Sequence, residues 1–81
     1  MHEAGIVKGI LEKVITEAQS RQAKKILKIK LKIGYLEMLS REHLQHHFSF
    51  LSKGSIAEDA VIEVEEFSGS GITIEKIEID D

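Results

Sequence analysis

Aliphatic and lysine residues alternate across positions 26–33, which limits the chain to folds that contain a sheet with one wet face. Successive side chains of a β-strand point to opposite faces, so the aliphatic residues share one face and the lysines share the other. The aliphatic set is Leu27, Ile29, Leu31 and Ile33, and the lysine set is Lys28, Lys30 and Lys32. We therefore predict a half-buried strand that ends at Gly34.

Two amphipathic helices are predicted, one before this strand in the sequence and one after it. Over residues 3–22, apolar residues recur at spacings of three and four, which is typical of a helix with one buried face. A second helix is expected over residues 41–53, with Ser40 as its N-cap and Gly54 as a left-handed terminator. The core residues expected from the second helix and the segment before it are Leu36, Met38, Leu39, Leu44, Phe48 and Leu51.

Two further strands are predicted over residues 60–67 and 72–79. The alternation in the third strand slips, and a bulge near Glu75-Lys76 would bring all its isoleucines onto the core face. Between the two strands lies Ser-Gly-Ser-Gly at residues 68–71, which permits a tight hairpin and also has the composition of a flexible linker.

The predicted order is α-β-α-β-β, an α+β fold with a small three-stranded mixed sheet and two helices on one face. A strand-helix-strand crossover makes the first two strands parallel, and the hairpin pairs the second strand with the third in antiparallel fashion. Each strand has one apolar face, so both helices should cover the same side of the sheet. On the other side, the lysines would face Glu63 and Glu65 across the strands.

Composition excludes several classes of function. The 81 residues make one domain, residues 1–81, and they include no cysteine, so neither a disulfide nor a cysteine-based zinc site is expected. The net charge of −3 argues against nucleic acid as a partner. No apolar run approaches the length of a membrane span and no secretory signal is recognisable, so a cytoplasmic protein without a membrane partner is expected. Catalytic motifs are absent, so the chain is not expected to be an enzyme.

Two groups of residues are candidate metal ligands. The terminal amine of Met1, the early backbone amides and the imidazole of His2 can surround Ni(II) or Cu(II) with nitrogen, although a terminal histidine can equally have no role and Glu3 can simply favour the helix start. His43 and His47 are four residues apart on the second helix, a competent spacing for two metal ligands, with His46 beside them. The alternative interpretation is that these three are ordinary histidines on a helix flank.

Four stretches of the sequence resemble the HypA/HybF family of nickel metallochaperones for hydrogenase maturation. They are Met1-His2-Glu3 at the first helix, Leu31-Lys32-Ile33-Gly34 at the end of the first strand, Leu44, Phe48, Leu51, Lys53-Gly54-Ser55-Ile56-Ala57-Glu58 and Ala60 in and after the second helix, and Ile74-Glu75-Lys76-Ile77-Glu78-Ile79 in the closing strand. The family carries a four-cysteine zinc domain where this chain has residues 68–71, so the resemblance implies a zinc-less relative or a form from which that domain was excised.

The resemblance also implies a function. Ni(II) would be held at Met1, His2 and Glu3, and the partners would be a GTPase accessory protein for nickel insertion and the hydrogenase large subunit, with urease as another client. The acidic residue that the family often has before its second helix falls at Ser40 here. The competing hypothesis is a metal-independent protein interaction module, which could form a homodimer through an unpaired edge strand.

Overall fold

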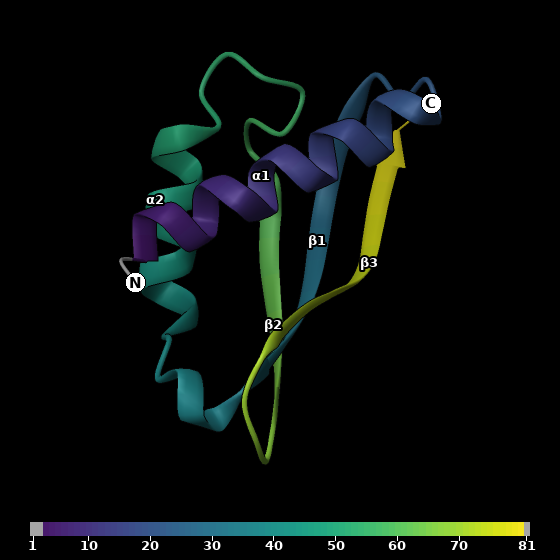
Figure 1. The fold of residues 1–81 in the computed structure, drawn as a ribbon. Helices are drawn as coiled ribbons and strands as arrows, with labels where there is room; N and C mark the ends of the chain where they lie inside the picture. The colour runs from purple at the N-terminus through teal and green to yellow at the C-terminus, as the bar shows by residue number, and fades with distance from the viewer. Residues whose placement is uncertain (1–2, 81) are drawn as a thin grey trace.

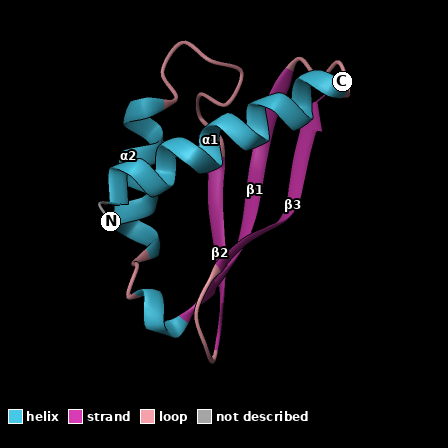
Figure 2. Cartoon of the chain, in the orientation of Figure 1, coloured by secondary structure: helices cyan, strands magenta, loops and turns pink. Residues whose placement is uncertain are grey.

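The computed structural model describes residues 3–80, and its elements follow the predicted order (Figures 1 and 2). They are α1 (Glu3–Ser20), β1 (Lys25–Gly34), a 3-10 turn (Tyr35–Glu37), α2 (Arg41–Leu51), β2 (Val61–Phe67) and β3 (Ile72–Asp80). α1 lies across β1 and β3, whereas α2 packs against β2 and against α1 (Figure 1). The α+β class and the mixed three-stranded sheet are confirmed.

The order of strands in the sheet is β2-β1-β3, with β1 parallel to β2 and antiparallel to β3. The parallel pair is confirmed, but the predicted hairpin between the second and third strands is wrong, because β1 lies between them. Charge explains the difference: β2 and β3 both carry glutamates on the face away from the helices, and pairing them directly would set like charges opposite each other. With β1 in the centre, its lysines lie between the two rows of glutamates.

The loop of residues 68–71 crosses the end of β1 instead of turning back tightly on β2. Its hydrogen bonds run from the Gly34 N–H to the Gly71 carbonyl (2.8 Å), from the Leu36 N–H to the Gly69 carbonyl (2.9 Å) and from the Gly71 N–H to the Glu37 carboxylate (2.7 Å). A Cβ on Gly34 would lie only 2.5 Å from the Cα of Ser70, so this crossing requires glycine at the end of β1. The loop is therefore fastened to the sheet.

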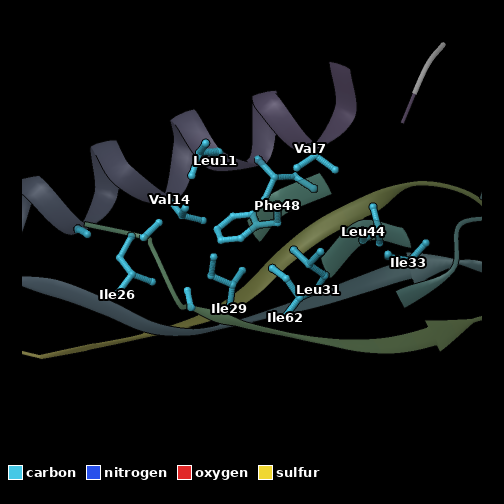
Figure 3. Close-up of a cluster of buried hydrophobic side chains, with 14 residues drawn as sticks. Val7, Leu11, Val14, Ile26, Ile29, Leu31, Ile33, Leu44, Phe48 and Ile62 are labelled. Carbon is cyan, nitrogen blue, oxygen red and sulfur yellow. The ribbon is translucent and has the colours of Figure 1, made fainter. Parts of the chain in front are cut away.

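The core lies between the two helices and the apolar face of the sheet (Figure 3). Its largest fully buried side chains are Phe48, Ile26, Ile29, Leu31, Ile33, Leu44, Ile62, Val7 and Val14. The predicted bulge in β3 is confirmed, since the pairing jumps from Lys30↔Lys76 to Leu31↔Ile74 and leaves Glu75 as the extra residue.

The prediction that Leu27 faces the core is wrong, because this side chain is 45% exposed. A second irregularity in the pairing explains it. Ile26 pairs with Ile79 and Lys28 with Glu78, so Leu27 is the unmatched residue. The shift turns Ile26 inward in its place, and Ile26 is fully buried.

Three other predicted core residues are also exposed. Leu36 and Met38 flank Glu37 in the segment after β1 and are 68% and 88% exposed, and Met38 has a left-handed backbone with φ 55°. Leu51 is the last residue of α2 and is 38% exposed. The segment after α2 contributes the small buried residues Ala57 and Ala60 to the core.

The position of α2 is fixed by polar contacts at its start and its middle. Ser40 is the N-cap, as predicted, and its hydroxyl accepts a hydrogen bond from the His43 N–H at 3.0 Å. The Gln45 side chain accepts from the Ile62 N–H at 2.7 Å and donates to the Ala60 carbonyl at 3.2 Å, which ties α2 to the beginning of β2. Gly54 has the expected left-handed backbone, with φ 82°, but α2 ends at Leu51 with Ser52 as its C-cap, before the predicted end at residue 53.

Candidate metal centre

The N-terminal candidate lies mostly outside the residues that the structure describes. Met1 and His2 are not among them, and α1 begins at Glu3. The first four N–H groups of a helix have no carbonyl partner within it. The backbone N–H of Glu3 therefore does not take part in the hydrogen bonds within α1. The expected nickel coordination requires this, because it uses the same nitrogen.

The first turns of α1 pack against α2 (Figure 1). Val7, one turn after Glu3, is 2% exposed and belongs to the same core cluster as Leu44 and Phe48 of α2 (Figure 3). His43 and His47 directly precede these two α2 residues in the sequence. The structure thus brings the beginning of α1 and the histidine-bearing helix to the same part of the molecule.

The three histidines of α2 differ in exposure. His43 and His46 are exposed and His47 is half-buried. The rings of His46 and His47 meet edge to face, with centroids 5.9 Å apart. Among residues 4–80, whose side chains the structure describes, no three His, Cys, Asp or Glu side chains gather closely enough to hold a metal ion. Any metal bound on α2 would therefore take only two ligands from this part of the chain.

The open face of the sheet carries a ladder of ion pairs, in the arrangement of charges that the sequence predicts. Lys30 lies 3.4 Å from both Glu65 and Glu75, Lys32 lies 3.3 Å from Glu75, and Lys28 lies 3.4 Å from Glu63. Lys28, Lys30 and Lys32 thus each have a carboxylate within reach, so these charges pair within the sheet itself.

Two residues of this ladder, Lys30 and Glu75, have shifted pKa values. Hydrogen bonds with Glu75 and then Glu65 raise the pKa of Lys30 above its ordinary value. Partial burial of the Glu75 carboxylate favours its neutral form, but the hydrogen bonds from Lys32 and Lys30 outweigh burial and lower the pKa of Glu75. Both shifts favour the charged forms of the pair.

The sequence did not reveal an apolar surface after β1, and three of the residues that line it, Leu36, Met38 and Leu39, were expected in the core. A groove of about 440 Å³ is lined by Tyr35, Leu36, Met38, Leu39, Ser40 and Glu66. Tyr35 is 69% exposed, and Phe67 at the end of β2 is 39% exposed. No periodic pattern marks this segment, because a single 3-10 turn is too short to show one.

The family model for "Hydrogenase/urease nickel incorporation, metallochaperone, hypA" matches residues 1–78. The chain belongs to the HypA family. The hydrogenase maturation factor HypA of Archaeoglobus fulgidus is 38% identical over 64 residues, which are 79% of this chain and 58% of that protein. HypA of Methanobrevibacter smithii is 38% identical over 66 residues, 82% of this chain and 53% of that protein.

The HypA fold is also found in a solved structure. The solution structure of the Ni metallochaperone HypA from Helicobacter pylori matches with a TM-score of 0.72 and 19% identity, over 94% of this chain and 72% of that one. The family predicted from the sequence is therefore confirmed. This chain spans between a half and six-tenths of the length of the two curated HypA relatives above. Among residues 3–80, no helix is long and apolar enough to cross a membrane.

Proposed function

We propose that this chain binds Ni(II) as cargo at its N-terminus and delivers it during hydrogenase maturation. The Met1 amine, the backbone nitrogens of His2 and Glu3 and the His2 imidazole would surround the metal. The observation that carries the proposal is the match to the nickel-incorporation family over residues 1–78, which includes these three residues. The chain would act as a carrier and not as an enzyme.

The start of α1 is compatible with this role in electrostatic terms. The N-terminus of a helix carries a partial positive charge and disfavours a cation. Backbone nitrogens bind Ni(II) only after losing their protons, so two of them would offset the charge of the metal. Acid would release the cargo, because protons compete for the same nitrogens. A delivery protein needs such reversible binding.

The remaining parts of the proposal follow from family membership. The recipients would be a GTPase accessory protein and the hydrogenase large subunit, with urease as an alternative client, in the cytoplasm. We also propose that the chain is a HypA form without the zinc domain, either natural or made by excision. The absence of cysteine from the 81 residues, together with the four-residue Ser-Gly-Ser-Gly segment at the place of the family's zinc domain, supports this.

Calorimetric titration with Ni(II) at neutral pH tests the N-terminal site. The chain that begins at Met1 should bind one equivalent, and His2→Ala should abolish this binding. A version with residues added before Met1 should lose it as well, because its amine is displaced. Lys8→Ala, on the exposed side of α1, is the matched control and should leave affinity unchanged. Unchanged affinity in His2→Ala would refute the assignment.

A second candidate function is a metal-independent homodimerisation module. In the sheet formed by the described residues, β2 and β3 are both edge strands, each with one unpaired side. Unpaired edges can accept a strand from another chain. Size-exclusion chromatography with light scattering, with and without Ni(II), separates the candidates. A dimer without nickel uptake would favour this module over the carrier.

A further inference from the structure

We propose that the free edge of β2 binds an extended segment of a partner protein in which basic residues alternate with aliphatic ones. In the sheet formed by residues 3–80, β2 is an edge strand with β1 on one side and no strand on the other (Figure 1). Its register with β1 is continuous from Lys28↔Val61 to Gly34↔Phe67. The other edge strand, β3, has two irregularities in its pairing with β1, which make it a poorer template for another strand.

The side chain of Gln45 already makes the hydrogen bonds of a neighbouring strand at the start of this edge. It accepts from the Ile62 N–H at 2.7 Å and donates to the Ala60 carbonyl at 3.2 Å. A residue of a strand added parallel to β2 would make the same two bonds with its own carbonyl and N–H. Along a strand, backbone groups two residues apart point the same way, so the N–H groups of Val64 and Glu66 also point to the free side. Beyond Gln45, the edge therefore offers the same hydrogen bonds to another chain.

A cleft beside these positions gives room for an added segment. It has a volume of about 290 Å³ and is lined by Val64 and Glu66 of β2 and by residues 39–42. Leu39 and Val64 are half-buried and pack against the core, so part of the lining is apolar. The cleft shares Leu39, Ser40 and Glu66 with the apolar groove described above. Aliphatic side chains of an added strand that point to the helix-covered face would thus meet an apolar surface.

The opposite face of β2 favours basic residues. Glu63 and Glu65 point to the open face, and their side chains keep 48% and 51% of their exposure although they already pair with lysines of β1. A residue added opposite either glutamate would point to the same face, where a lysine or arginine would form a second ion pair. The residue between them, opposite Val64, would point to the helix-covered face and the cleft. The preferred order is therefore basic, aliphatic, basic.

The pairing of β2 with β1 shows that β2 accepts this pattern. Residues 30–32 of β1 lie parallel to residues 63–65 of β2, with Lys-Leu-Lys opposite Glu-Val-Glu. A second copy of the chain does not offer such a strand, because its β1 is paired on both sides and both outer strands carry glutamates on the open face. Like charges directly opposite each other destabilise a strand pair. The occupant is therefore a segment of a different protein, and its binding requires no metal.

The test is fluorescence anisotropy with the full chain and a labelled peptide in which lysine and leucine alternate. We expect saturable binding without added metal. A peptide with glutamate in place of lysine should not bind. A peptide of the same composition, with its lysines and leucines in separate blocks, should bind about tenfold more weakly, because strand addition takes its specificity from alternate side chains.

Variants of β2 locate the binding edge. Glu66→Pro removes an N–H that faces the free side, a place where edge strands tolerate proline, and it should abolish binding. Glu66→Gln keeps this N–H and is the matched control, which should retain binding. Glu63→Gln combined with Glu65→Gln should weaken binding about tenfold, because two cross-strand ion pairs are lost. The same number of charges removed from α1, by Glu12→Gln with Glu17→Gln, should have no comparable effect. Far-UV circular dichroism establishes that each variant is folded.

Amide hydrogen exchange tests the unsubstituted chain and decides the matter if Glu66→Pro does not fold. Peptide binding should slow exchange at Val64 and Glu66, and less so at Ile62, whose N–H already binds Gln45. The proposal would be overturned by a lack of saturable binding, by equal binding of the glutamate peptide, or by binding that survives in folded Glu66→Pro. A dimer that protects Val64 and Glu66 without peptide would also overturn it, because a second copy would then cover the edge.

Discussion

The two faces of β1 are stabilised by different forces, although their residues alternate in the sequence. Ile29 on the helix-covered face is fully buried, whereas the Lys30 side chain on the open face retains 35% of its exposure. Burial of apolar surface contributes more stability per residue than ion pairs at this exposure, which contribute little. The apolar face therefore holds the sheet against the helices.

The open face has a different role, because its charges determine which strands lie next to each other in the sheet. Only β1 carries a row of lysines, and both outer strands present glutamates to it. The order β2-β1-β3 pairs unlike charges on both sides, whereas an order with β2 next to β3 would not. One face of the strand thus supplies stability, and the other supplies specificity of pairing.

The largest expected effect is on the buried face. Ile29→Ala should lower the free energy of unfolding by about 2–5 kcal/mol, because it removes buried methyl groups and leaves a cavity. Urea unfolding measures this. Leu27→Ala, two residues earlier and 45% exposed, is the matched control and should change stability by about 0.5 kcal/mol or less. Equal losses at the two positions would contradict the assigned faces.

The next effect concerns the end of β1, where the loop of residues 68–71 crosses. Gly34→Ala should lower the free energy of unfolding by about 1–3 kcal/mol, because the new methyl group would press on the backbone of Ser70. Gly9→Ala in α1 is the control. An added Cβ there meets nothing within 4 Å, and alanine should stabilise the helix by about 1 kcal/mol. A loss at Gly9 as large as at Gly34 would refute the steric explanation.

A smaller effect is expected on the open face. Lys30→Gln should reduce stability at neutral pH by less than Ile29→Ala does, and added salt should shrink the difference from the unsubstituted chain. Lys8→Gln, on exposed α1, should have no comparable salt dependence. A salt-independent loss in Lys30→Gln would indicate that the side chain acts by packing and not by charge.

Acid should act on the same ion pair. The pKa of Glu75 is lower in the folded state than its ordinary value, so its contribution is complete above that value and is lost as pH falls through the folded pKa. The difference between Lys30→Gln and the unsubstituted chain should therefore shrink in acid. Urea unfolding repeated at decreasing pH measures it.

A further small effect tests the one buried side-chain atom without a hydrogen-bond partner among the described residues, the hydroxyl oxygen of Ser52. Ser52→Ala should raise stability by about 1 kcal/mol, because the buried hydroxyl has no compensating bond. Ser55→Ala is the control and should lower stability, since the Ser55 hydroxyl donates to the Ser52 carbonyl and accepts from the Ala57 N–H. Destabilisation by Ser52→Ala would show that the hydroxyl is in fact used.

The elements of this fold were predictable because their signals are local. Alternation identified β1, three-four spacing identified α1, and Ser40 marked the start of α2. The slip in β3 predicted its bulge correctly, because four isoleucines needed one buried face. Periodicity and capping each depend on only a few adjacent residues, so they can be read without knowledge of the tertiary structure.

Strand order and the exposed residues were not predictable in the same way. The small residues at 68–71 permit a hairpin, and nothing local to them shows that the chain instead passes over Gly34. The exposure of Leu27 depends on the irregular pairing of β1 with β3, which is far away in the sequence. The proximity of α1 to the α2 histidines is likewise a tertiary property. The N-terminal motif was found by resemblance, and it stays a prediction.

The crossing at Gly34 has a consequence for any segment inserted in the loop of residues 68–71. β2 and β3 reach this loop on opposite sides of β1, so the two attachment points lie two strand spacings apart, about 9–10 Å. A domain inserted there would be attached at two points, one on each side of the central strand β1. Two separated attachment points would let the domain tilt about the line that joins them but would restrict its rotation about other axes. A domain inserted in a tight hairpin has adjacent attachment points, which restrict rotation less.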